Sequence, residues 1–198
     1  MRSPHALGAL VASVVLGCAG SAHAEDIDGG VRFKSVDLQG NPLGVVIGRY
    51  SLDLEYLPLP HHALHLTPVG YFALPGWADQ YFGYGAEIGY RWYSGVDGPQ
   101  GFFVGGSALV GSFTYVHTAQ PEVPLDMSDN TTFAQLGAAV DVGYQIVCLG
   151  NFAVGAGAGL SFTHDTQTPH FEAGNTHDDL LYGAGLRPRA LLSVGAAF

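Results

Sequence analysis

Polar and apolar side chains alternate along most of this chain, and this alternation constrains its fold more than any other feature. In residues 82–93, Tyr84, Ile88 and Trp92 share one face, while glycines and charged side chains share the other. A repeat of two residues is the period of a β-strand, whose successive side chains point to opposite faces. The same pattern occurs in residues 51–57, 133–146, 152–163 and 186–198.

Three less regular segments bring the expected number of strands to eight. Residues 63–73 alternate, but Pro68 lacks a backbone donor and is expected to mark a bulge. Residues 101–116 carry bulky side chains on both faces, so neither face is assigned to the outside. The first strand lies within residues 31–47, where the Asn-Pro pair at 41–42 is expected to kink it.

The connections between these strands alternate between short and long. Short turns are expected at 60–62, 95–99 and 148–151, and longer connections at 74–81, 117–130 and 165–185. Only the first connection, around Gly48, departs from this alternation. Short turns at one end and long loops at the other are typical of transmembrane β-barrels, whose long loops are extracellular. We therefore expect an all-β fold, a closed antiparallel eight-stranded up-and-down transmembrane barrel, because lipid offers no partner to a free strand edge.

The two faces of these strands favour a membrane barrel over a soluble one. The interior of an eight-stranded barrel has room for little more than side chains, so long charged residues fit there only beside small neighbours. Glycines do share a face with charged residues in this chain. We expect a polar, filled lumen in which opposite charges pair, because unpaired buried charges are costly. The expected lumen charges are Asp53, Glu55, Glu87, Arg91, Asp141, Arg187 and Arg189.

Aromatic residues near the strand ends predict two girdles at the membrane interfaces. Phe152 and Phe162 lie ten residues apart, as do Phe103 and Phe113. Ten residues at a rise of about 3.3 Å, tilted by about 40°, span about 25 Å, which is the height of an outer-membrane apolar band. The expected girdle residues are Tyr84, Tyr90, Trp92, Phe103, Phe113, Tyr144, Phe152, Phe162 and Phe198, together with Phe133.

The N-terminal residues resemble a targeting signal rather than part of the fold. Arg2 precedes an apolar run over residues 6–17, and residues 22–24 form an Ala-His-Ala cleavage site. We expect a signal peptide over residues 1–24 and an outer-membrane β-barrel domain over residues 25–198.

The two cysteines leave a second interpretation of the N-terminus open. Residues 15–18 resemble a lipobox, in which Cys18 would be lipidated and become the mature N-terminus. If Cys18 is removed with a signal peptide, Cys148 is the only cysteine left and no internal disulfide is expected.

Composition excludes several functional classes. Charged residues make up 12% of the chain, whereas a soluble domain carries about 25%. Aromatic and aliphatic residues are abundant, which excludes a disordered chain. The net charge of −10 would repel a phosphate backbone, so no nucleic-acid partner is expected.

Over about residues 31–198 the chain resembles the small eight-stranded outer-membrane proteins of the OmpA/OmpX type. The last segment, 190–198, alternates and ends in Phe198, as the C-terminal signature of such barrels does. The resemblance implies recognition of Phe198 by the barrel-assembly machinery, contact with outer-membrane lipids and lipopolysaccharide, and a monomer. An even strand count implies a cell outer membrane protein with both termini periplasmic. No peptidoglycan-binding domain is expected, since none follows Phe198.

Three functions remain open at this point. The first is a structural or surface-interaction role, with a filled lumen and acidic extracellular loops. The second is a narrow channel for ions or small solutes, in which the lumen charges set selectivity. The third is a lipid A-modifying enzyme, for which Ser161, Thr163 and His164, or Ser112 and His117, lie near strand ends.

No catalytic residue, metal or cofactor is assigned from the sequence. No nucleophile elbow or other hydrolase motif occurs. The last long connection is rich in imidazoles and carboxylates, but their spacing matches no metal-binding motif. These residues are His164, Asp165, His170, Glu172, His177, Asp178 and Asp179.

Overall fold

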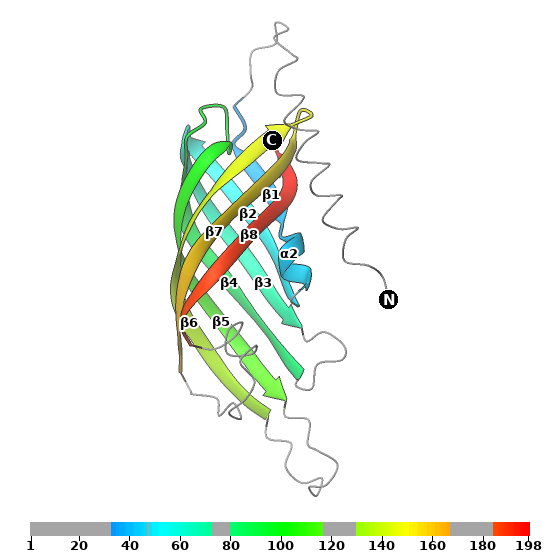
Figure 1. The fold of residues 1–198 in the computed structure, drawn as a ribbon, viewed down its shortest axis with the longest axis vertical. Helices are drawn as coiled ribbons and strands as arrows, with labels where there is room; N and C mark the ends of the chain where they lie inside the picture. The colour runs from blue at the N-terminus through cyan, green and yellow to red at the C-terminus, as the bar shows by residue number, and fades with distance from the viewer. Residues whose placement is uncertain (1–32, 47, 73–79, 117–129, 167–183) are drawn as a thin grey trace, which may run out of the picture.

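The fold is a closed barrel of eight antiparallel strands, as expected from the alternation (Figure 1). The computed structural model describes residues 33–46, 48–72, 80–116, 130–166 and 184–198. The strands are β1 (Val36–Gly40), β2 (Arg49–Leu59), β3 (His62–Phe72), β4 (Gln80–Tyr93), β5 (Gly101–Val116), β6 (Asn130–Cys148), β7 (Phe152–Asp165) and β8 (Gly185–Ala197). One helix, α2 (Pro42–Val46), follows β1, and no described helix is long and apolar enough to cross a membrane.

The barrel closes between its first and last strands. Val36 N donates to the carbonyl oxygen of Phe198 at 3.1 Å, and Phe198 N donates back to Val36 at 2.7 Å. Asp37 lies opposite Ala197 in the same ladder. The C-terminus therefore lies at the end that holds the short turns between β2 and β3, β4 and β5, and β6 and β7 (Figure 1). We call this end the turn end and the opposite one the loop end.

The distribution of side chains is the inverse of that in a soluble barrel. Tyr84 is 74% exposed and Leu136 is 54% exposed on the outer wall, whereas Glu87 and Asp141 are each 4% exposed in the lumen. Apolar side chains of every strand cover the outer wall. The interior holds the charged side chains, other polar and small ones, and a few large apolar ones. This placement follows from the alternation, because glycines leave the room that the charged side chains need.

Residues 31–47 hold a short strand and a helix rather than one kinked strand. Gly44 N donates to Asn41 Oδ1 at 3.0 Å, so Asn41 caps α2, and Pro42 occupies its first position. Asn is among the best N-cap residues, and Pro is favoured at the first helical position because it has no N–H to satisfy. The Asn-Pro pair therefore ends β1 and starts a helix.

The prediction of a bulge at Pro68 is wrong. Pro68 pairs with Ala86, and the β3–β4 register continues unbroken on both sides of it. The register shift in this part of the sheet lies instead between Tyr56 and Leu59 of β2, around Pro58.

Three aromatic residues assigned to the girdles face the lumen instead. Phe103, Phe113 and Phe133 are 2% to 4% exposed. The Phe113 ring packs between Tyr71 and Phe133, with centroid distances of 5.0 and 5.7 Å. The bulky residues on both faces of β5 concealed this orientation in the sequence. Glycines make the room, since a Cβ at Gly83 or Gly143 would meet the Phe113 or Phe103 ring.

The other girdle residues lie on the outer wall. Phe152 is partly exposed there, and the remaining side chains are exposed. These exposed residues are Tyr84, Tyr90, Trp92, Tyr144, Phe162 and Phe198.

Candidate functional site: a charged lumen with an arginine-lined cavity

Polar side chains from four strands fill the lumen at the turn end. Asp37 of β1, Glu55 of β2, Arg91 and Tyr93 of β4 and Gln145 of β6 form what we call the turn-end cluster. Tyr93 Oη donates to Glu55 Oε2 at 2.7 Å, and Gln145 Nε2 donates to Asp37 Oδ2 at 2.6 Å. Arg91 Nη1 also donates to Glu55. The cluster thereby ties these four strands together across the axis of the barrel.

Asp53 extends this cluster toward the middle of the barrel. Its Oδ2 lies 3.3 Å from Arg91 Nη1, and its Oδ1 accepts a hydrogen bond of 2.7 Å from Thr67 Oγ1. His65 Nδ1 lies 3.5 Å from the same Oδ1. The Arg91 guanidinium is thus shared by two carboxylates, which offsets part of the cost of burying all three charges.

Apolar side chains complete the filling of the turn end. Leu57, Ala63, Tyr93 and Phe103 form one buried cluster, against which Leu191 packs. The Arg91 guanidinium carbon lies 4.8 Å from the centre of the Phe103 ring, in cation–π geometry. Tyr93 and Ala63 are fully buried. At this end the lumen is therefore occupied by side chains rather than open.

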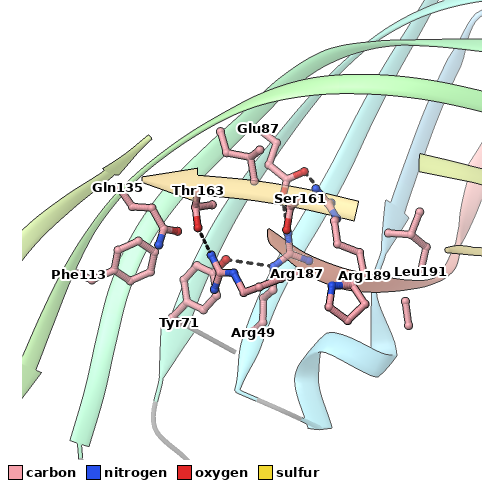
Figure 2. A pocket seen from close by; sticks show the side chains of 13 residues that line it. Arg49, Tyr71, Glu87, Phe113, Gln135, Ser161, Thr163, Arg187, Arg189 and Leu191 are labelled. Atoms are coloured by element: carbon pink, nitrogen blue, oxygen red, sulfur yellow. Dashed lines mark hydrogen bonds and ion pairs between the residues drawn. The ribbon is translucent and has the colours of Figure 1, made fainter. Parts of the chain in front are cut away.

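A second group of charges lies toward the loop end and centres on Glu87. We call Arg49, Glu87, Asp141, Arg187 and Arg189 the loop-end cluster. Arg189 Nη2 donates to Glu87 Oε2 at 2.8 Å, and Arg49 donates to Glu87 Oε1. Arg189 Nε also lies 3.5 Å from Asp141 Oδ1. Arg187 donates to Thr163 Oγ1, as Figure 2 shows.

A cavity of about 140 Å³ lies beside this second cluster. Figure 2 shows three guanidinium groups converging on it, from Arg49 on β2 and from Arg187 and Arg189 on β8. Glu87 is the only carboxylate among its described lining residues. Tyr71 Oη accepts a hydrogen bond of 3.2 Å from Arg49 Nε at the cavity wall. The cavity is thus rich in cationic donors, the groups that bind phosphate and carboxylate.

All seven charged residues expected in the lumen carry their side chains there, and the structure divides them between the two clusters. Asp53, Glu55 and Arg91 lie toward the turn end. The other four lie in the loop-end cluster: Glu87, Asp141, Arg187 and Arg189.

The serines and histidines considered for catalysis do not come together among the described residues. Ser161 and Thr163 are buried in the lumen, whereas His164 is exposed on the outer wall. This follows from the strand period, since residues 161 and 164 of one strand must face opposite ways. His117 lies outside the described residues.

Most of the potential metal ligands in the last long connection lie outside the described residues. This applies to those in residues 170–179, while His164 and Asp165 end β7. Within the part of the chain that the structure describes, no group of three or more potential ligands gathers around one point.

Further side chains lie in the lumen besides the seven charged residues expected there. Arg49 borders the connection expected around Gly48, yet it opens β2 and binds Glu87. Arg49 lies two and four residues before Ser51 and Asp53, so the alternation of β2 places all three side chains on the same, inner face. Asp37 and Gln39 lie in the poorly alternating first segment, which gave no such signal. Tyr93 shares the face of Glu87 and Arg91 in the alternation of residues 82–93, and it lies in the lumen with them.

Comparisons with known proteins support the fold. No family model matches the sequence, and no curated protein matches it. Among solved structures, the chain is similar to the N-terminal β-barrel domain of OprF from Pseudomonas aeruginosa. The two chains share 15% identity with a TM-score of 0.50, covering 84% of this chain and 98% of that one. The expected resemblance is confirmed at the level of architecture: this chain has the closed eight-stranded fold of the OprF barrel domain.

Proposed function

We propose that this protein is a monomeric outer-membrane barrel with a structural or surface-interaction role and a lumen that does not conduct. The single observation that carries the proposal is the inverted distribution of side chains, with apolar residues on the outer wall and paired charges inside. An exposed apolar band around a closed barrel is suited to hydrocarbon. Because the barrel closes, most backbone N–H and C=O groups of the strands are hydrogen-bonded to each other without water.

We infer the orientation in the membrane from the positions of the termini. Both ends of the described barrel lie at the turn end, where Val36 pairs with Phe198. We place this end in the periplasm, consistent with a signal peptide over residues 1–24 and with recognition of Phe198 by the barrel-assembly machinery. The long connections then face the outside of the cell, where their acidic residues meet lipopolysaccharide, outer-membrane lipids or other surfaces.

The turn-end cluster favours a sealed lumen over a channel. An ion that passed through would have to separate Tyr93 from Glu55 and Gln145 from Asp37, and each of these groups is buried. Leaving such a group without its partner costs about 1–3 kcal/mol. Several such losses together would make an open state rare.

Planar-bilayer recording of the refolded full chain tests the proposal. We expect no discrete conductance steps from a preparation that runs as a folded barrel before boiling and shifts in mobility after it. Regular steps from this preparation would contradict the sealed lumen and favour the channel. A chain that shows no such heat-dependent shift would contradict the membrane barrel itself.

A further inference from the structure

The barrel wall is incomplete on one side toward the loop end. β1 pairs with β8 only from Asp37 to Gly40, opposite Val194 to Ala197. β8 continues for nine more residues, 185–193, which have no strand partner on that side among the described residues. We call this gap between β8 and β2 the seam.

The backbone of β8 is adapted to the seam. Phe198 N bonds to Val36 of β1, while Ala197 N bonds to Asn151 on the β7 side. Since alternate residues of a strand point their backbone groups to the same side, the even-numbered residues of β8 face the seam. Pro188 is one of them, and the β7–β8 register runs unbroken past it. Proline is tolerated where its nitrogen faces no partner strand, so Pro188 marks an edge.

Helix α2 takes the place that a longer β1 would fill. It contacts both β2 and β8. Gly44 is its one buried residue, and a Cβ there would meet the carbonyl oxygen of Arg49, so the helix lies tightly against β2. Leu43, Val45 and Val46 are exposed and apolar. Only the part of the seam next to β1 is therefore bridged, by one short helix with exposed apolar side chains, beside the wall in Figure 1.

The arginine-lined cavity reaches this seam. Five consecutive residues of β8, from Arg187 to Leu191, line it. Pro188 and Ala190 are exposed on the outer wall, and their backbone groups point to the seam. A cavity confined to the lumen would be lined mainly by the alternate residues, Arg187, Arg189 and Leu191. The contact with all five places its boundary at the edge of β8.

The charge of the cavity selects the kind of group that would bind. Three guanidinium groups face one carboxylate among its described lining residues, in a chain whose net charge is −10. Arg189 Nη1 is buried and has no hydrogen-bond partner among the described residues. A buried donor without a partner is unfavourable, so an anionic acceptor at this position would be stabilising.

We propose that the seam is a lateral opening through which the phosphate group of a membrane amphiphile reaches the arginine-lined cavity, while its acyl chains lie along the apolar wall of α2 and β8. This proposal rests on the proposed function, because lipid reaches the seam only if the barrel lies in a membrane. An irregular wall at membrane depth is tolerated where it lines a polar cavity, which matches the seam.

Native mass spectrometry of the full chain in non-ionic detergent tests this, with dioleoyl phosphatidic acid as the probe. We expect one phosphatidic acid to bind, and dioleoyl phosphatidylcholine and inorganic phosphate to bind more weakly. Arg189→Gln should weaken phosphatidic acid binding about tenfold, because a hydrogen bond between charged groups is lost. Ala190→Trp should weaken it similarly by obstructing the seam without touching the charge network.

The matched control is Ala158→Trp. Ala158 lies directly opposite Ala190 in the β7–β8 ladder, is also exposed on the outer wall, and does not line the cavity. This control should bind phosphatidic acid as the unsubstituted chain does. Equal weakening by both tryptophans, equal binding of inorganic phosphate, or no binding at all would overturn the proposal. A conducting barrel that binds the lipid contradicts the proposed function alone, and a sealed barrel that does not bind it contradicts this inference alone.

Discussion

Arg189 of β8 and Glu87 of β4 meet across the lumen, with Nη2 and Oε2 2.8 Å apart. The other oxygen of Glu87 accepts a hydrogen bond from Arg49 of β2. Arg49 and Arg189 stand on the two strands that flank the seam, where β1 is too short to join them. One carboxylate therefore holds together the two strands that the backbone ladder leaves unpaired at this end.

Glu87→Gln should destabilise the barrel strongly. The substitution leaves the side chains of Arg49 and Arg189 without a shared counter-charge, and breaking a buried ion pair from one side costs roughly 3–5 kcal/mol. The temperature at which the unboiled protein loses its folded mobility on a gel measures this. Asp97→Asn, which removes a carboxylate in the turn between β4 and β5, is the control and should change little. Equal effects of the two substitutions would show that Glu87 does not hold β2 and β8 together.

Tyr93→Ala should both destabilise the barrel and open its turn end. Tyr93 is fully buried, binds Glu55 and packs on Phe103 at a centroid distance of 5.7 Å. Removing a buried aromatic ring costs roughly 3–5 kcal/mol, and discrete conductance steps should appear in planar bilayers. Tyr84→Ala is the control, because Tyr84 belongs to the same strand but lies on the outer wall. If the Tyr93→Ala barrel shows no conductance steps in bilayers, side chains other than Tyr93 close the lumen.

Proline should be tolerated at position 188 and not at position 158. Pro188→Ala should change the free energy of unfolding by no more than about 0.5 kcal/mol, because the new N–H faces the seam. Ala158→Pro should cost considerably more. The nitrogen of Thr166 bonds to Ala134 of β6, so even-numbered residues of β7 face β6, and proline would remove a ladder bond there. Urea unfolding in detergent compares the two, and equal costs would contradict the assigned seam.

Asn41→Ala should loosen α2. The side chain of Asn41 caps the helix at Gly44 N, and removing such a cap costs about 1 kcal/mol. Asn41→Ser keeps an acceptor at this position and should restore most of the loss. Amide hydrogen exchange over residues 43–46 reports the effect directly. Unchanged exchange in Asn41→Ala would mean that packing on β2 and β8, rather than the cap, holds the helix.

The sequence predicted the strands whose two faces differ clearly. In β4 and β6 one face is apolar and the other carries glycines and charged side chains. The alternation alone therefore places Glu87 and Asp141 in the lumen. The hydrophobic pattern fixes the face of such a strand because a shift of one residue would reverse every side chain.

The features that could not be predicted depend on contacts between residues far apart in the sequence. Phe103 and Phe113 face the lumen because glycines opposite them on the neighbouring strands β6 and β4 make room for their rings, and no local pattern on β5 reports this. The same holds for the first segment, where an Asn-Pro pair is compatible with either a kinked strand or a capped helix. The seam arises from the difference in length between β1 and β8, which appears only when the two strands are paired.

We propose that the apolar face of each strand meets lipid, whereas the charged face lines the lumen. Tryptophan fluorescence in brominated phosphatidylcholine vesicles tests it most directly, in a chain whose native Trp77 and Trp92 are replaced by Phe. Leu136→Trp, on the outer wall of β6, should be strongly quenched, and Phe133→Trp, three residues away in the lumen, much less. Stronger quenching of the tryptophan at 133 than of the one at 136 would contradict the account.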